Sequence, residues 1–143
     1  MDSIDKNQPE DNSKNLKGRG AVAKIKELAE KAQSCFFITG FSAKGPVATR
    51  PMSVQKIDSE GNLWFMSASD SHKNAEIKHN PHVQLMFQGS AHSDFMNLYG
   101  RATITTDKRK IKELWEPLAK TWFTEGIDDP RITVIKVAPS EGY

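Results

Sequence analysis

The spacing of apolar residues divides the chain into a polar start, one helix and a series of short strands. Residues 1–20 are rich in Asp, Asn and Lys and have no apolar period, which predicts a disordered N-terminal segment ahead of one domain over residues 21–143. Between Val22 and Ala32, apolar residues recur at helical spacing and charged residues fill the other positions. An amphipathic helix is therefore expected at the start of the domain.

Six later stretches have the aromatic, β-branched or alternating character of strands, and they cover residues 35–41, 47–57, 63–68, 83–87, 94–106 and 132–137. The loop between the second and third stretches contains Gly61, which suits a hairpin turn. Gly100, inside the fifth stretch, predicts a bulge or a close approach of two backbones.

Two shorter helices are predicted among the strands. One covers residues 73–79 and is stopped by Asn80-Pro81, and the other covers residues 111–118. Hairpins rather than long crossovers join most of the strands. The pattern therefore predicts a mainly β protein of the α+β type, with six antiparallel strands in a closed or nearly closed barrel and helices at its flanks.

Composition narrows the location and the partners of this domain. Its length suffices for one core, and the formal net charge of +2 does not indicate nucleic acid or an acidic membrane as a partner. The single cysteine, Cys35, begins an apolar run, so a buried thiol is expected and an intrachain disulfide is excluded. With no signal-peptide pattern and no apolar run of membrane length, the sequence predicts a soluble protein of the reducing cytoplasm.

Small hydroxyls and cations gather around the second and third predicted strands and the helix that follows them. Arg50 can bind phosphate oxygens with two parallel hydrogen bonds, Lys73 adds a second positive charge, and Ser67 and Ser71 add hydroxyls. Ser71 also occupies the N-cap position of the helix, where free N–H groups favour an anion. The cluster predicts a phosphate pocket to which His72 can also donate. The alternative is a set of ordinary surface residues and a helix cap.

Other motifs add less. The chain has no nucleophile elbow, P-loop or dinucleotide-binding fingerprint, and its four histidines lack the spacing of a zinc helix, so no metal site is expected. Trp115, Trp122 and Phe123 form an aromatic group in the last third of the chain. This group fits core packing and, equally, a wall against a flat ligand or a partner subunit.

Several short motifs follow one another in a recognisable order: Arg50-Pro51-Met52-Ser53-Val54, Asp58-x-x-Gly61-x-Leu63-Trp64-Phe65, Ser71-x-Lys73, Asn80-Pro81-x-Val83-x-Leu85, Gly100-x-Ala102, Glu113-Leu114-Trp115-x-Pro117 and Trp122-Phe123-x-x-Gly126-x-Asp128-Asp129-Pro130. In this order and spacing they resemble the pyridoxamine-phosphate-oxidase-like FMN-binding split barrels, and within them the general stress protein branch. The resemblance covers about residues 20–143.

The resemblance implies a homodimer that binds FMN, or alternatively FAD, at the subunit interface. Arg50 and Lys73 would hold the phosphate, and the backbone of residues 51–54 would run beside the isoalloxazine ring. Tryptophans would approach from the helical segment, in part from the partner subunit. The expected cofactor-binding residues are Arg50, Pro51, Met52, Ser53, Val54, Phe65, Ser67, Ser71, His72, Lys73, Trp115 and Trp122.

Three departures separate the chain from the true oxidase of that family. Its last residues lack the Trp-x-Pro-x-Arg-Leu segment of the oxidase, and Phe95 stands about where the oxidase has a glutamine near the flavin. Oxidation of pyridoxamine phosphate is therefore not expected. His72 replaces the commoner arginine of a Ser-Arg-Lys triplet, which predicts a lower or pH-dependent affinity for phosphate.

The sequence thus favours an FMN-binding, stress-related flavin oxidoreductase whose substrate it does not identify, and no catalytic residue is assigned. The alternative is a non-catalytic binding or storage protein for FMN, FAD or haem. Bound flavin that NADH and NADPH cannot reduce would favour this alternative.

Overall fold

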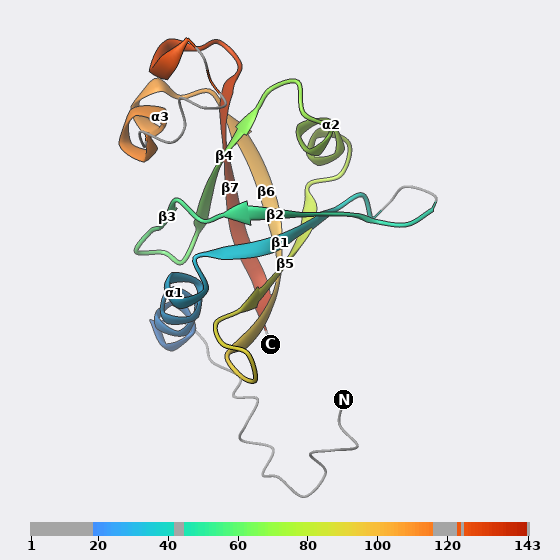
Figure 1. The fold of residues 1–143 in the computed structure, drawn as a ribbon, viewed down its shortest axis with the longest axis vertical. Coiled ribbons are helices and arrows are strands. Elements are labelled where there is room, and N and C mark those ends of the chain that lie inside the picture. Colours follow the sequence, from blue (N-terminus) through green and yellow to red (C-terminus); the bar gives the residue numbers. More distant parts are fainter. Residues whose placement is uncertain (1–18, 42–44, 116–122, 124, 143) are drawn as a thin grey trace, which may run out of the picture.

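A computed structural model describes residues 19–41, 45–115, 123 and 125–142. Seven antiparallel strands form one sheet in the order β2-β1-β5-β6-β7-β4-β3, and the sheet curls into a half-barrel (Figure 1). In the chain the elements are α1 (Arg19–Ala32), β1 (Ser34–Thr39), β2 (Ala48–Ser53), β3 (Lys56–Ile57), β4 (Leu63–Ala68), α2 (His72–His79), β5 (His82–Gln88), β6 (Phe95–Thr105), α3 (Lys108–Leu114), a 3-10 turn (Gly126–Asp128) and β7 (Ile132–Gly142).

The two edges of the sheet are formed by consecutive pieces of chain. β2 pairs with β1, β3 pairs with β4, and only residues 54 and 55 separate β2 from β3. These two residues form the link between β2 and β3. The link is held on both sides, because Val54 N–H donates to the carbonyl of Gln33 and Gln55 N–H donates to the carbonyl of Trp64. The predicted antiparallel split barrel is confirmed. The strand predicted over residues 47–57 is two strands, because the chain changes its pairing partner at this link.

Other boundaries also differ from the sequence prediction, and two of these differences have a clear structural cause. β7 runs five residues past the predicted end at Val137, because its last part pairs with β6 beyond a register shift at Tyr99/Gly100. A Cβ at Gly100 would lie 2.8 Å from the carbonyl oxygen of Ala138, so the bulge and the close approach predicted there are both present. α3 begins at Lys108 rather than at residue 111, because the Asp107 side chain caps the helix by accepting from Arg109 N–H. It ends at Leu114, and residues 116–118 of the predicted helix lie outside the described residues.

The apolar residues form two cores. The larger core fills the half-barrel, with Phe37 and Phe65 meeting edge to face at 5.1 Å between ring centroids. The smaller core lies under α3 and is built around Trp64, Ile111 and Phe123. Cys35 is buried in the larger core, and this burial raises the pKa of its thiol to about 12, as expected of an inert core cysteine.

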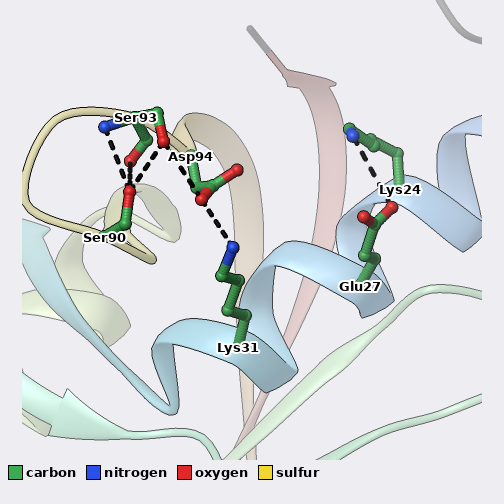
Figure 2. A network of polar contacts seen from close by, with 6 residues as sticks. All are labelled: Lys24, Glu27, Lys31, Ser90, Ser93 and Asp94. Carbon is green, nitrogen blue, oxygen red and sulfur yellow. Dashed lines mark hydrogen bonds and ion pairs between the residues drawn. The ribbon is translucent and has the colours of Figure 1, made fainter.

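The amphipathic helix α1 closes the lower end of the half-barrel in Figure 1, where Leu28 and Ala29 join the larger core. Figure 2 shows how its last turn is tied to the β5–β6 loop: Lys31 Nζ lies 2.7 Å from Asp94 Oδ2, and Ser90 bonds Ser93 in the same loop. Exposed ion pairs of this kind contribute little stability individually, so the apolar contacts of α1 fix its position. No helix in the described ranges combines the length and apolar character needed to cross a membrane.

The turn before β7 is organised by one buried carboxylate. Asp129 is fully buried and accepts hydrogen bonds from the Arg131 side chain, from Arg131 N–H and from Glu125 N–H. The Arg131 guanidinium, then its backbone N–H, holds the pKa of Asp129 down at about 2. Because the pKa is lowered in the folded protein, Asp129 adds stability above the unfolded value of about 3.9.

We predict that this stabilisation is lost as the pH falls from about 4 through 2, because the carboxylate must then be protonated. Asp129→Asn should lower the urea midpoint at pH 7 and reduce its dependence on pH between about 4 and 2. Asp128→Asn changes the same charge at an exposed neighbouring position and serves as the control. Equal pH dependence in both variants would contradict this assignment. Urea unfolding at several pH values measures it.

Candidate functional site

The start of α2 is fastened to the sheet by a buried polar network. Asn74, in the first turn of α2, donates from Nδ2 to the hydroxyl of Thr133 on β7 at 2.8 Å. Thr133 donates to the backbone carbonyl of Ser67 on β4 and accepts from the Ser67 hydroxyl at 2.7 Å. Asn74 and Thr133 are both nearly inaccessible to water. Because buried polar groups must be paired, this network fixes the position of α2 over β4 and β7.

The hydroxyls of Ser67 and Ser71, which were predicted to donate to a phosphate, take part in this network instead. Ser71 is the N-cap of α2, as predicted: its oxygen accepts from Asn74 N–H, and its proton goes to Asn74 Oδ1. Thr133 gives its single proton to the Ser67 carbonyl, so the Ser67 hydroxyl is the donor to Thr133. The hydroxyl protons of Ser67 and Ser71 are therefore donated to other side chains of the protein, and both residues help to position α2.

Arg50 lies on β2, where two neighbours hold its guanidinium. Nη1 donates to the buried hydroxyl of Thr39 at 2.9 Å, and Nη2 lies 3.6 Å from Oε1 of Glu76 on α2. Thr39 in turn donates to Glu76 Oε2 at 2.5 Å. The guanidinium is therefore oriented by a neutral and a charged acceptor, one from β1 and one from α2. Sequence reasoning did not single out Thr39 or Glu76. Glu76 carries a usable signal, because it lies three residues after Lys73 on the same helix face.

Lys73 stands at the second position of α2 and is half-buried. Among the described residues its ammonium forms no hydrogen bond or ion pair. Burial, and then repulsion from the neighbouring Arg50, lowers the pKa of Lys73. An ammonium that is partly removed from water and lies beside a second cation is destabilised unless an anion is added. The predicted proximity of Arg50 and Lys73 is therefore present, and their arrangement fits an anion.

The other predicted contacts are distributed along β2 and elsewhere. β2 is an edge strand, so its outer backbone edge pairs with no described strand, which suits Pro51. Ser53 is exposed, whereas Met52 and Val54 pack against the larger core. The exposed His72 stands at the first position of α2.

The two aromatic candidates that the structure describes, Phe65 and Trp115, pack in the two cores. Phe65 is fully buried in the larger core, so its ring packs against other core residues. Trp115 caps the end of α3 and packs against the smaller core. Core packing is thus the role observed for Trp115 in the single chain, and Trp122 lies outside the described residues.

Large apolar side chains are exposed on the outer face of the strands beside β2. Phe36 on β1 is 56% exposed and lies opposite Met86 on β5, which is 45% exposed. Phe36 also lies opposite Pro51 of β2 in the register of the sheet, and Phe95 at the start of β6 is 60% exposed. This outer face, defined by Phe36, Pro51, Met86 and Phe95, is the kind of surface that a partner covers. This outer face was not predicted from the sequence, although the alternation of side chains along the strands indicates which of them point outward.

Comparison with known proteins agrees with this architecture. The model of the family described as Pyridoxamine 5'-phosphate oxidase like matches residues 20–143. Protein bli-3 of Neurospora crassa is 30% identical over 105 residues, which cover 67% of this chain and 50% of that protein. The chain spans about half the length of this curated relative.

Solved structures share the fold at lower sequence identity. General Stress Protein 26 from Bacillus anthracis str. Sterne has a TM-score of 0.74 at 20% identity, with 86% of this chain and 92% of that chain covered. The general stress FMN/FAD binding protein from Xanthomonas citri has a TM-score of 0.67 at 21% identity, with 84% and 85% covered. At these identities the likeness establishes the split-barrel fold. Since the family model spans nearly all of the described domain, this chain belongs to the pyridoxamine 5'-phosphate oxidase-like family.

Proposed function

We propose that this protein binds FMN, with the phosphate held by Arg50 and Lys73 at the start of α2. The observation that carries the proposal is the half-buried Lys73 ammonium, which lies beside Arg50 and has no acceptor among the described residues. A phosphate placed between the two groups would neutralise both and accept charge-assisted hydrogen bonds. The first N–H groups of α2 have no carbonyl one turn earlier and add donors at the same helix start.

The flavin ring is proposed to lie along the outer edge of β2, over residues 51–54. Apart from Val54 N–H, which donates to the Gln33 carbonyl, the backbone groups on that edge pair with no described strand, and a flat ring with polar edges can bond them. In this arrangement Ser67 and Ser71 act by holding α2 in place, as their hydrogen bonds indicate. The Xanthomonas citri protein of the same fold is an FMN/FAD binding protein, which supports a flavin as the ligand.

A bound flavin supplies electron transfer to or from a small molecule. We infer an oxidoreductase role of this kind in a stress-related setting, in which the chain binds and orients the cofactor. Reduction of the flavin-loaded protein by NADH or NADPH, followed as loss of flavin absorbance under anaerobic conditions, tests this role. A flavin that neither donor reduces, although it is reduced by dithionite, would favour the non-catalytic binding protein.

A second copy of the chain is proposed to cover the outer face of Phe36, Pro51, Met86 and Phe95. These side chains are exposed and lie next to the proposed ring site on β2. An interface at this face would bury apolar area and bring the partner against the ring edge of β2. The flavin would then lie at the boundary between the two subunits.

The binding proposal is tested first on the purified protein. Native mass spectrometry should find one flavin per chain and will separate FMN from FAD by mass. Arg50→Ala should weaken FMN binding by about 1.5–3 kcal/mol, since a charge-assisted contact is lost. Arg109→Ala removes the same charge from an exposed position on α3 and should leave the dissociation constant unchanged. Protein that takes up no added FMN, or an Arg50→Ala variant that binds as well as wild type, would overturn the proposal.

FMN affinity should also depend on pH through Lys73. Because burial and the neighbouring Arg50 lower the pKa of Lys73 in the free protein, its ammonium loses its proton at a lower pH than an ordinary lysine does. Affinity should therefore decline as the pH rises above neutrality toward the range in which an ordinary lysine titrates, with proton uptake on binding. Lys73→Gln should bind more weakly at pH 7 and lose this decline, whereas Lys78→Gln, on the exposed side of α2, should retain it. Fluorescence titrations across this range make the comparison. Identical pH profiles for the two variants would exclude Lys73 from the site.

Dimerisation can be tested at the outer face. Met86→Glu places a charge opposite Phe36 and should shift a dimer toward monomer in sedimentation velocity at micromolar concentration. Ser59→Glu adds the same charge in the exposed turn between β3 and β4, at the other edge of the sheet, and serves as the control. A wild-type monomer under these conditions, or a Met86→Glu dimer as tight as the wild type, would remove this face from the proposed interface.

A further inference from the structure

One carboxylate lies beside the cations at which the phosphate is proposed to bind. Glu76 is on α2, and its Oε1 lies 3.6 Å from Nη2 of Arg50. The side chains of Arg50 and Glu76 are 23% and 29% exposed, so water screens their charges only in part. An anion that binds beside Arg50 is therefore repelled by this carboxylate. Tight binding of a phosphate does not by itself call for an acid at this position.

A threonine stands between the carboxylate and the guanidinium. Two groups of this kind ordinarily meet through two parallel N–H···O bonds. Here the Thr39 hydroxyl takes one of those places, because it accepts from Arg50 Nη1 at 2.9 Å and donates to Glu76 Oε2 at 2.5 Å. The remaining contact, at 3.6 Å, is longer than a hydrogen bond. The guanidinium thus gives one hydrogen bond to the described residues, and its other N–H groups are left for a ligand.

The carboxylate is held in this position from three sides. Thr39 is fully buried on β1, so water cannot replace its two hydrogen bonds. The next residue, Gly40, packs against the same group, since a Cβ there would lie 3.1 Å from Glu76 Oε2. The helix that carries Glu76 is anchored to the sheet through Asn74. The carboxylate is therefore near enough to Arg50 to repel a ligand anion and too far from it to form the two-bond pair.

We propose that Thr39 and Glu76 hold the affinity of the phosphate site at a moderate level, so that the bound ligand is exchangeable. This inference rests on the proposed function, because the ligand is the phosphate group held by Arg50 and Lys73. Glu76 lowers the affinity by opposing the negative charge of the ligand. Thr39 limits that effect, because its hydroxyl prevents the carboxylate from closing on Arg50 and competing directly with the ligand. Both act through Arg50 and are positioning residues.

Removal of the acid charge tests the role of Glu76. Glu76→Gln keeps the shape of the side chain and an oxygen for Thr39, and it should bind FMN at least about fivefold more tightly because one repulsive charge is lost. Riboflavin, which lacks the phosphate, should bind the variant and the wild type equally to within about twofold. Glu27→Gln removes the same charge from an exposed position on α1 and serves as the control. Quenching of flavin fluorescence measures all of these affinities. An FMN affinity at or below the wild-type value in Glu76→Gln, or an equal gain for riboflavin, would overturn the proposal.

Removal of the hydroxyl tests the role of Thr39. Thr39→Val keeps the shape of a buried side chain and frees the carboxylate to pair with Arg50 through two bonds, so FMN should bind at least about fivefold more weakly. Addition of Glu76→Gln should abolish this loss, because an uncharged amide is a weaker competitor for the guanidinium, and the double variant should bind as Glu76→Gln does. Thr39→Ser retains the hydroxyl and should recover most of the lost affinity. A loss that persists unchanged in the double variant would show a structural effect of the valine and overturn the role of Thr39. Melting temperatures report whether each variant is folded, and Glu76→Gln with Thr39→Ser decides the proposal if the valine variants are not.

Inorganic phosphate is a second probe that does not depend on the flavin. Titration into ¹⁵N-labelled protein should shift the Arg50 Nε–H resonance, with dissociation constants that increase in the order Glu76→Gln, wild type, Thr39→Val. This order in a protein that takes up no FMN would refute the proposed function and support the role of Thr39 and Glu76. FMN binding without this order for either ligand would leave the proposed function intact and overturn the inference. Absence of binding by both ligands would overturn both.

Discussion

The arrangement of the candidate site depends on the hydroxyl of Thr133. This one group accepts from Asn74 at the start of α2, accepts from Ser67 on β4 and donates to the Ser67 carbonyl, so it is saturated. Its burial makes every one of these bonds costly to lose, since water does not replace them. The helix start is therefore fixed relative to β4 and β7. The positions of Lys73 and Glu76 follow from that constraint.

Charge balance around this helix start explains how the cluster can be stable and still receptive to an anion. Glu76 and Thr39 hold the Arg50 guanidinium from two sides, so arginine has a defined orientation in the protein itself. Lys73 has no such partner among the described residues, and its lowered pKa reflects burial and the nearby arginine. The carboxylate of Glu76 is thus near two cations, Arg50 and Lys73, and balances the charge of only one of them. The surplus positive charge at a helix N-terminus is the physical basis for expecting a phosphate there.

Much of the fold followed from local patterns, whereas the details of the site depended on contacts between distant segments. Alternation in residues 83–87, the Ser71 cap and Gly100 each specified a local structure that the protein has. The division of residues 47–57 was not predictable from propensity, because it results from a change of pairing partner across the barrel. Ser67 was likewise predicted as a free hydroxyl donor, because local sequence does not reveal its partner. That partner, Thr133, lies 66 residues away in the sequence.

The central claim is that the cations at the start of α2 recognise a phosphate group. Comparison of FMN with riboflavin, by quenching of flavin fluorescence at pH 7 and low salt, tests it most directly because the two ligands share the ring and differ in the phosphate. Two charge-assisted contacts predict that FMN binds at least about 100-fold more tightly than riboflavin. Equal dissociation constants for the two flavins would contradict the account.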